Sequence, residues 1–369
     1  MYKLLIFFVF LSLSSMAQIN TPIRNQNSNS IELEKKQSKK VLEREPVEAT
    51  NAVVSNYEAF TLNVRYLKSE LNNLALSSTR KTPTPKQQKQ FEAQLKYIKS
   101  LDHKSFDYHL LNYQVGNYDF SRIKSLKTAA KIKPLDFTVL KELSAYYYII
   151  DDQKDLSNHL IKIDQQGYFS SDLIAFATNT LLSLPKKSVL VSHGEQDTYP
   201  LLIQQKIKNI RSDVEIISLE HLQSEDYRKK LKKQGMKMPN TEIIDTHFFD
   251  QFLALNKNHN IVVASTLPKP YLMKVEGIAN AGLGFAYESS VKEEYNLNIY
   301  HQLMKQAIQT HIDTAKDQKI LVNYLPYLFS VRNQMMEIED QNSVREIELL
   351  IYQIGRASNT LGKIKKIMK

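Results

Sequence analysis

Residues 188–200 read Ser-Val-Leu-Val-Ser-His-Gly-Glu-Gln-Asp-Thr-Tyr-Pro, and this stretch decides the fold. A short apolar run, typical of a buried strand, leads into a polar loop and then into a helix that opens with Asp197, Thr198 and Pro200. In α/β proteins the carboxyl end of such a strand is where ligands usually bind. The stretch therefore predicts an α/β unit with a candidate site at the end of its first strand.

The candidate site comprises five polar residues around this strand end, where a small polar ligand could lie on the amino terminus of the helix. They are His193, Glu195, Gln196, Asp197 and Thr198. Helix capping explains most of the same motif, because Asp197 or Thr198 would cap the helix and Pro200 would occupy its first turn, where a missing N–H costs nothing. Ligand binding and capping both stay open at this point.

The chain after Pro185 alternates between strand and helix patterns. Short apolar runs bounded by Gly, Pro or Asp predict four strands, at Val189–Ser192, Glu215–Leu219, Ile261–Ser265 and Gly284–Tyr287. Helical patterns lie between them, at Leu201–Asn209, Ser224–Gln234 and Thr246–Asn256. This alternation predicts right-handed βαβ crossovers and a small parallel sheet.

The chain before Pro185 reads as helical hairpins. Apolar residues alternate spacings of four and three from Val53 to Leu74, Ser77–Pro85 interrupts the pattern, and Phe91 resumes it, which predicts an antiparallel helix pair. Residues 106–185 resemble degenerate tetratricopeptide repeats, because an offset of 34 residues aligns one apolar pattern with the next. Generic helical hairpins are the alternative.

The C-terminal tail, from about Tyr295 to Lys369, is again helical. Ser343 followed by Glu346 is a capping-box pattern that predicts a helix start there. Gly355 and Gly362 leave room for the close approach of another backbone. We expect this tail to pack against the protein's own α/β unit; a coiled coil with a partner is the alternative.

Composition agrees with a mixed, mainly α fold made of tetratricopeptide-like helical hairpins, a small parallel α/β unit and a helical C-terminal tail. The 369 residues are 42% hydrophobic and 24% charged, as in ordinary globular proteins, and 20 Tyr and 15 Phe against 9 Gly favour helix packing. We expect five segments: a signal peptide (1–17), a disordered tether (18–48), the hairpins and repeats (49–185), the α/β domain (186–292) and the C-terminal helices (293–369).

The N-terminus has the features of a secretory signal peptide. Lys3 is followed by the apolar run Leu4–Leu13, which is too short to span a bilayer, and then by Ser15-Met16-Ala17, which predicts cleavage before Gln18. No later segment approaches a transmembrane length. An exported chain without Cys can form no disulfides, and we expect it in the periplasm or cell envelope of a Gram-negative bacterium.

The formal net charge is +10, and removal of Lys3 with the signal peptide leaves +9. In an exported protein this favours acidic proteins, anionic headgroups or polyanionic glycans over nucleic acid as partners. The densest basic cluster is Arg228, Lys229, Lys230, Lys232, Lys233 and Lys237. Favourable interaction of these bases with a helix dipole explains the cluster more simply than a binding patch does.

The sequence contains no complete set of catalytic, metal or cofactor residues. His193-Gly194 and Asp197 resemble the acid segment of α/β-hydrolases, with His221 downstream, but no nucleophile elbow precedes them. No His-Glu-x-x-His motif and no Gly-rich nucleotide loop occurs. Asp245 reads as a helix cap rather than a metal ligand. We therefore expect no cofactor, no metal and no catalysis.

A longer resemblance covers Val189–Leu222. The strand, Gly-Glu-Gln-Asp-Thr-Tyr-Pro-Leu at 194–201, Ile-Arg-Ser-Asp-Val at 210–214 and the following strand resemble the soluble C-terminal region of a bacterial membrane family related to protein O-mannosyltransferases. Weaker similarity follows at 261–266 and 282–287. The chain lacks that family's multi-span membrane half, which holds the glycosyl-transfer chemistry, so no catalytic residue is carried over.

These observations predict an exported, non-enzymatic scaffold or adaptor that binds another protein of the cell envelope or secretion machinery. Repeat arrays offer binding surfaces without intrinsic chemistry, which suits such a role. The alternative, which follows from the family resemblance, is an accessory protein that binds or modifies envelope glycans.

Overall fold

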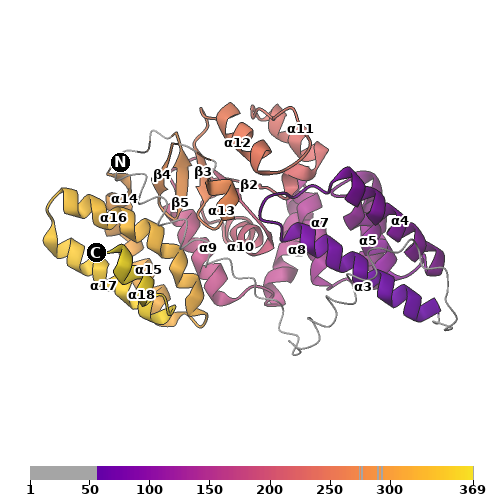
Figure 1. The fold of residues 1–369 in the computed structure, drawn as a ribbon, viewed down its shortest axis with the longest axis horizontal. Helices are drawn as coiled ribbons and strands as arrows, with labels where there is room; N and C mark the ends of the chain where they lie inside the picture. Colours follow the sequence, from indigo (N-terminus) through magenta and orange to yellow (C-terminus); the bar gives the residue numbers. More distant parts are fainter. Residues whose placement is uncertain (1–55, 274, 276, 289–290, 292–293, 369) are drawn as a thin grey trace.

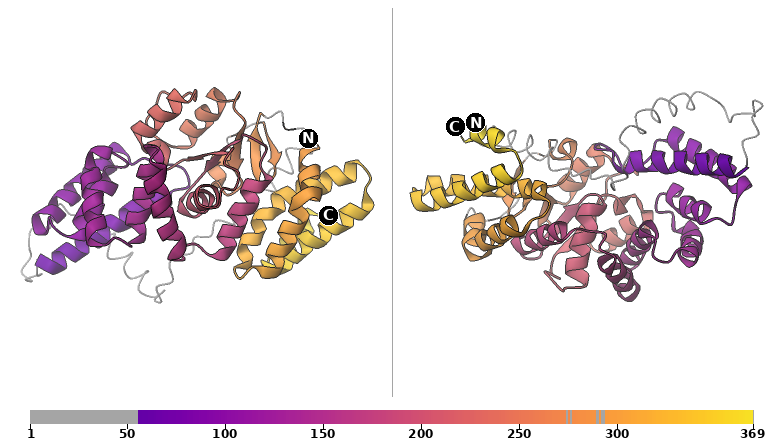
Figure 2. Two further views of the ribbon diagram at one scale, coloured as in Figure 1. Left: turned by 180° about the vertical axis from the view of Figure 1, so that it is seen from behind. Right: turned by 90° about the horizontal axis from the view of Figure 1, so that it is seen from below.

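The computed structural model describes residues 56–273, 275, 277–288, 291 and 294–368. The predicted signal peptide, the predicted tether and the beginning of the first predicted helix lie outside the described residues. Within them the chain is mainly helical with one small sheet, which confirms the expected fold class. The helical hairpins, the sheet and the C-terminal helices follow one another along the long axis of the molecule (Figure 1), and the same order appears in both further views (Figure 2).

The first helix pair, α3 (Asn56–Ala75) and α4 (Pro85–Leu101), packs through a small apolar cluster with α5 (Phe106–Val115). Thr84 begins α4 with a complete capping box, because its hydroxyl accepts from the Gln87 N–H while the Gln87 side chain accepts from the Thr84 N–H. This cluster is separate from the larger core around the sheet.

The next helices form the predicted succession of hairpins. They are α6 (Ile123–Ile132), α7 (Phe137–Ile149), α8 (Gln153–Gln165) and α9 (Ser171–Ser183), with α5 packed on α6 and α7 packed on α8. α7 begins at Phe137 and α9 at Ser171, so the offset of 34 residues relates one helix to the next at this point. The helical repeat is therefore present in the structure.

The sheet has five strands in the order β2-β1-β3-β5-β4. Four lie where the sequence predicts them, at β1 (Val189–Ser192), β2 (Glu215–Ser218), β3 (Ile261–Ala264) and β5 (Gly284–Tyr287). Only β2, β1 and β3 are parallel to one another, whereas β5 is antiparallel to β3 and to the additional strand β4 (Ile278–Ala281). The expectation of a wholly parallel sheet is therefore wrong.

The reversal between β4 and β5 depends on Gly282. Ala281 pairs with Gly284, so only two residues form the turn, and Gly282 has a φ of 60°. A left-handed backbone at the first turn position favours Gly in a two-residue hairpin. A Cβ at this position would also lie 2.1 Å from the Ser183 carbonyl oxygen. The Gly therefore both permits the turn and lets it pack on the end of α9.

The helices that lie between the strands in sequence cover the sheet. They are α10 (Glu195–Lys206), the 3₁₀ helix η2 (His221–Gln223), α11 (Glu225–Lys233), α12 (Thr246–Leu255) and α13 (Lys269–Leu272). All four residues of β1 and of β3 are buried, as expected of strands covered on both faces. Asp245 caps α12 as predicted, because its carboxylate accepts from the His247 and Phe248 N–H groups.

The C-terminal helices have a core of their own that includes Leu283 of the sheet turn and Phe176 of α9. They are α14 (Tyr295–Ile299), the π-helical turn η3 (Tyr300–Met304), α15 (Lys305–Thr314), the 3₁₀ segment η4 (Gln318–Tyr324), α16 (Leu325–Glu337), α17 (Gln341–Ala357) and α18 (Leu361–Ile367). The tail therefore packs on the protein's own α/β unit. Among the described helices, none is both long and apolar enough to cross a bilayer.

Two details of this tail differ from the sequence prediction. The cap of α17 is Asp340, whose carboxylate accepts from the Ser343 N–H and hydroxyl, so the predicted helix start at Ser343 is wrong by one turn. Gly355 does allow close packing, because a Cβ there would lie 2.7 Å from the Ile364 side chain. Gly362 faces open space instead, so it has no such role.

Candidate functional site

The end of β1 turns into α10 at Gly194, which has a φ of 72° and is the residue before the helix. Because this left-handed turn starts the helix at Glu195, neither Asp197 nor Thr198 is its cap, and Pro200 lies inside it rather than in its first turn. The capping prediction is therefore wrong. Only a residue that tolerates positive φ can make so sharp a strand-to-helix turn.

The five predicted site residues all lie at this turn, but their side chains have different roles. The Asp197 carboxylate accepts from the backbone N–H of His193 at 3.1 Å, and burial raises the pKa of Asp197 to about 6. The Thr198 hydroxyl is buried and bonds to the Ser192 hydroxyl. Glu195 forms an ion pair with Lys141 at 3.0 Å, and Gln196 is half-buried on the first turn of α10.

Glu220, which follows β2, adds a carboxylate to the candidate site at the strand ends. One of its carboxylate oxygens accepts from the Gly194 N–H at 2.8 Å and from the Ser218 hydroxyl at 3.0 Å. The other lies 3.7 Å from Nε2 of His193. The protein's own carboxylate thus occupies the amino terminus of α10, the position at which a helix favours an anion.

Lys81 reaches the same place from the loop between α3 and α4. Its side chain is buried, with Nζ 3.4 Å from Glu220 and donating to the carbonyl oxygens of Ala75 and Ser77 at 2.8 and 3.0 Å. Burial lowers the pKa of Lys81, and the Glu220 carboxylate opposes this shift. Lys81 and Glu220 therefore form an ion pair at the strand ends, in which Lys81 is buried and Glu220 is half-buried.

Backbone hydrogen bonds hold the α3–α4 loop in this position. Arg80 and Asp245 form an antiparallel bridge, flanked by a bond from the Lys81 N–H to the Ile244 oxygen at 2.7 Å. The Ile244 N–H donates in turn to the Thr82 hydroxyl at 2.8 Å. In Figure 1 this loop, in indigo, extends from the hairpin to the α/β unit. The loop closes over the strand ends, so the hairpin and the sheet are joined there.

The electrostatics of the cluster follow from its burial. Burial raises the pKa of Glu220, but His193 and Lys81 lower it more strongly, and the result is a pKa of about 2. Burial lowers the pKa of His193 to about 4, against the opposing charge of Glu220. At neutral pH the carboxylate is charged and the imidazole is neutral, so the main charge pairing is between Glu220 and Lys81.

Several buried polar atoms at the strand ends have no hydrogen-bond partner among the described residues. They are Nε2 of His193, the hydroxyl of Ser265 after β3, the hydroxyl of Tyr271 on α13 and Oε1 of Glu220, which makes only the ion-pair contacts at 3.4 and 3.7 Å. Buried polar groups are usually paired, and unpaired ones often mark a place that holds a small molecule or water. Together they offer both donors and acceptors to a neutral, hydroxyl-rich ligand.

His221 lies in an aromatic surrounding. The rings of Tyr118, Tyr148, Tyr199 and Tyr227 lie with their centroids 5.9 to 6.4 Å from that of His221. Burial lowers the pKa of His221 to about 4. Such an imidazole is neutral and packed like a hydrophobic ring. Within the described part of the chain, no three His, Asp or Glu side chains converge as metal ligands would.

Sequence reasoning found this end of the sheet but missed its main charged pair. Glu220 follows directly after β2, so the rule that placed His193 at a strand end could have placed Glu220 beside it. Lys81 gives no such signal, because it lies in a short break between two helices far from the strands in sequence. Its role follows only from the packing of the hairpin on the α/β unit.

Comparison with known proteins connects this region with one family. Residues 173–353 match the family model described as TMEM260-associated domain 2. The match starts in α9 and ends in α17, so it includes the whole sheet and most of the C-terminal helices. No curated protein and no solved structure matches the chain. Just under half of the chain is thus similar to a domain associated with TMEM260, a family related to O-mannosyltransferases.

Proposed function

We propose that this protein is an exported, non-enzymatic scaffold that binds another protein of the bacterial cell envelope or secretion machinery. The observation that carries the proposal is the closed state of the strand ends. The place where an α/β unit usually binds its ligand is covered by the protein's own α3–α4 loop, with Lys81 paired to Glu220. The polar groups there serve to join two parts of the chain.

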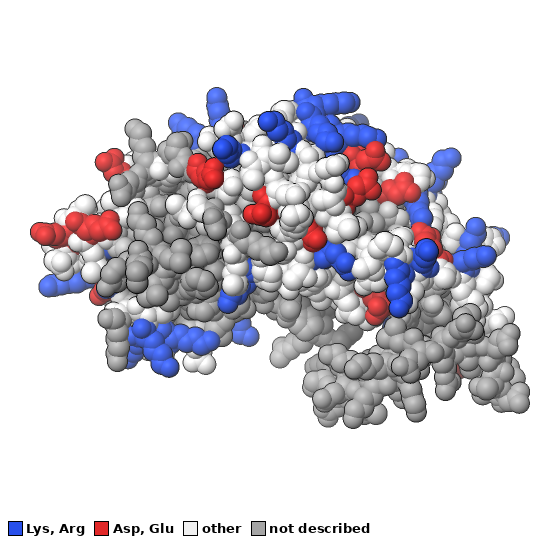
Figure 3. Space-filling view, turned by 45° about the horizontal axis from the view of Figure 1, so that its top comes forward, with Lys and Arg blue, Asp and Glu red and all other residues white. Residues whose placement is uncertain are grey.

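The surface supports a protein partner with acidic groups. Lys232, Lys233, Lys237 and Lys257 are exposed, and their ammonium groups form no ion pair with any described residue. The first three surround the end of α11, and Asn256 bonds to the backbone of Lys237, which brings Lys257 beside them. Figure 3 shows Lys and Arg side chains gathered along the upper edge of the molecule. An unpaired basic surface favours association with acidic partners.

The experiment that tests the scaffold is partner capture from envelope extracts of the source cells, with chemical crosslinking. The matched variant replaces Lys232, Lys233, Lys237 and Lys257 by Glu, and the control variant replaces the same number of exposed lysines on α4 and α8. We expect one main partner, lost with the first variant and retained with the second. Capture of no partner by the wild-type protein would refute the scaffold function.

Export is a separate part of the proposal. The n-region, the apolar run and the small residues before Gln18 support a mature chain that starts at Gln18 in the periplasm or envelope. Mass analysis of the N-terminus in each cell fraction tests this. An intact Met1 on a cytosolic protein would be the contrary result.

A second candidate function, glycan binding, has its own support in the unpaired polar atoms of His193, Ser265 and Tyr271 and in the match to the TMEM260-associated domain. Hydroxyl-rich ligands can satisfy donors and acceptors together. A glycan array probed with wild-type protein and with Lys81→Ala, which opens the strand ends, distinguishes the two functions. Binding that appears or strengthens in Lys81→Ala would favour glycans over a protein partner.

A further inference from the structure

A second polar feature lies away from the strand ends, between α9 and α15. These two helices run beside each other, and a groove of about 320 Å³ lies between them. Its lining includes Ala175, Thr178 and Asn179 of α9 and Ala307, Thr310 and His311 of α15. The small side chains keep the groove open, and at neutral pH none of its lining side chains carries a charge.

The hydrogen bonds beneath this groove favour one tautomer of His311. The Nδ2 group of Asn179 donates to the Tyr324 hydroxyl oxygen at 2.7 Å, and that hydroxyl lies 2.6 Å from Nδ1 of His311. Because an amide nitrogen can only donate, the Tyr324 proton is free to donate to Nδ1 of His311. With Nδ1 an acceptor, the proton of the neutral imidazole is on Nε2.

This places an unused donor at the floor of the groove. His311 is 3% exposed, and its Nε2 has no hydrogen-bond partner among the described residues. Burial lowers the pKa of His311, with Asp172 opposing, so the ring stays neutral in the physiological range. A buried N–H without an acceptor costs roughly 1–3 kcal/mol, so an oxygen acceptor in the groove would recover part of this free energy.

The shape of the groove fits an extended peptide. On the side opposite α9, the lining residues Leu303 of η3 and Ala307, Thr310 and Thr314 of α15 follow one helix face. Eleven helical rises of 1.5 Å give a length of about 16 Å, which about five residues of extended chain would span. The lining contains no Phe, Tyr or Trp on which a sugar ring could stack. A groove without charge and with one fixed donor favours an uncharged peptide whose carbonyl accepts from His311.

We propose that the α9–α15 groove binds an extended, uncharged peptide segment, with the Nε2–H of His311 donating to a peptide or amide carbonyl oxygen. The inference extends the scaffold function by naming a place and a chemistry for a partner segment. The ligand class rests on that function, whereas the groove and its preset donor do not.

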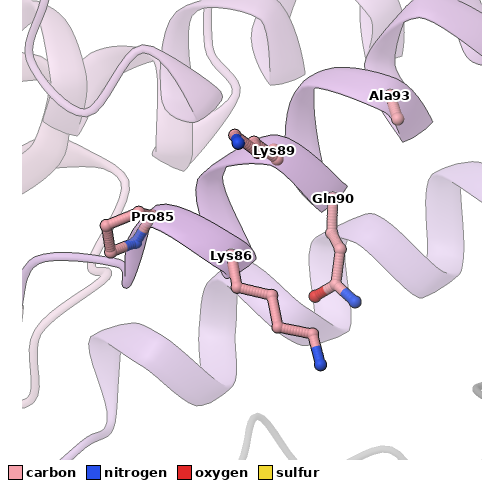
Figure 4. A pocket seen from close by; sticks show the side chains of 5 residues that line it. All are labelled: Pro85, Lys86, Lys89, Gln90 and Ala93. Carbon is pink, nitrogen blue, oxygen red and sulfur yellow. The ribbon is translucent and has the colours of Figure 1, made fainter.

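The hollow over α4 provides a matched control. It is of similar size, about 430 Å³, but its lining comes from one helix, and all five residues are exposed: Pro85, Lys86, Lys89, Gln90 and Ala93 (Figure 4). It contains no buried unpaired donor. The variant Ala307→Leu fills the α9–α15 groove, and Ala93→Leu adds the same side chain to the control hollow.

The test uses nitrogen-15 NMR of the His311 ring together with peptide retention on immobilised protein. The probes are a pool of capped pentapeptides of Ala, Ser, Thr, Asn and Gln, a matched pool containing Lys and Glu, and methyl mannoside. We expect the free protein to have its ring proton on Nε2, and the uncharged pool alone to shift this signal in a saturable way. Retention of that pool should fall at least tenfold in Ala307→Leu and stay unchanged in Ala93→Leu.

Several results would overturn the inference: a ring proton on Nδ1, equal retention by Ala307→Leu and wild type, or a response to the charged pool or the sugar alone. If Ala307→Leu lowers the melting temperature, Thr310→Leu takes its place, because Thr310 is exposed. Partner capture that survives both groove variants would refute the groove while leaving the scaffold intact. A saturable response of the His311 signal without any captured partner would refute the scaffold function and leave the groove inference intact.

Discussion

The strand ends and the α9–α15 groove both bury polar groups, but they use them in opposite ways. At the strand ends Lys81 and Glu220 are charged and face each other across the contact between hairpin and sheet. In the groove the groups from Asn179 to His311 are neutral, and Nε2 of His311 is buried without a hydrogen-bond partner among the described residues. The comparison teaches that a buried ammonium group such as that of Lys81 needs an internal counter-charge, whereas a neutral buried donor such as Nε2 of His311 can remain without an internal partner.

The largest expected effect comes from removing the ion pair between Lys81 and Glu220 at the strand ends. Lys81→Met leaves the half-buried Glu220 without its counter-charge and should lower the free energy of unfolding by about 3 kcal/mol. Urea unfolding measures the change. Lys68→Met is the matched control, because Lys68 pairs with Asp107 at 2.6 Å but is 45% exposed, and should cost less than about 1 kcal/mol. Equal effects of the two substitutions would show that the Lys81 pair does not join hairpin and sheet.

The second effect concerns pH. The pKa values of His193 and His221 are about 4 in the folded protein against 6.5 for an ordinary His, so the unfolded chain binds more protons between these values. The stability contributed by the neutral rings is present above pH 6.5 and is lost as the pH falls toward 4.

His221→Phe keeps the aromatic packing and removes one of these two groups. Between pH 7 and pH 4, wild type should therefore lose about 2–3 kcal/mol more stability than this variant. Chemical unfolding at a series of pH values provides the measurement. Parallel pH profiles for the two proteins would mean that His221 does not titrate as described.

The third effect comes from removing the neutral hydrogen bonds beneath the α9–α15 groove. Tyr324→Phe removes the hydroxyl between Asn179 and His311, so a buried donor and a buried acceptor lose their partner, at a cost of about 2 kcal/mol. Tyr168→Phe is the control, because the Tyr168 hydroxyl donates to the Leu135 oxygen at an exposed position and should cost about 0.5 kcal/mol. Thermal unfolding compares them. A Tyr324→Phe protein as stable as the control would argue against a preset donor.

The smallest effect sharpens the role of Asp197. Its pKa of about 6 lies above the ordinary 3.8, so its favourable contribution is present below pH 3.8 and is lost as the pH rises through 6. Asp197→Asn cannot ionise. Relative to wild type, it should gain about 1 kcal/mol of stability between pH 5.3 and pH 7.5. Unfolding curves at the two pH values decide this, and a difference that does not change with pH would exclude a buried carboxyl.

The fold could be predicted from the sequence where it depends on a pattern of residues within one strand or helix. Apolar runs bounded by polar residues located four strands to within a residue, and the spacing of apolar residues located the helices. Strand direction was not predictable in the same way, because it depends on the turn at Gly282, whose left-handed backbone reverses the chain. The start of α10 was misplaced for the same reason, since Gly194 makes the turn that a capping side chain was expected to make.

The candidate site was predictable only in part. The strand-end rule located His193 and Asp197. The predicted role of Asp197 as the helix cap is wrong, because its carboxylate accepts from the His193 N–H instead. The Lys81–Glu220 pair and the Asn179–Tyr324 bond each join segments distant in sequence, and no local spacing encodes such contacts. The polar contacts of the candidate site and of the groove depend on tertiary packing, whereas the strands and helices follow from local sequence patterns.

The contact between the α3–α4 loop and residues 244–246 has a consequence for the order of folding. The hairpin precedes the sheet along the chain, so it leaves the ribosome before Glu220 and Ile244 are available. Until then the ammonium of Lys81 must stay in water, because burying it alone would be costly. Such a long loop closure is slow. We therefore expect the N-terminal hairpin to form early on its own apolar cluster and to dock last, as the step that completes the native protein.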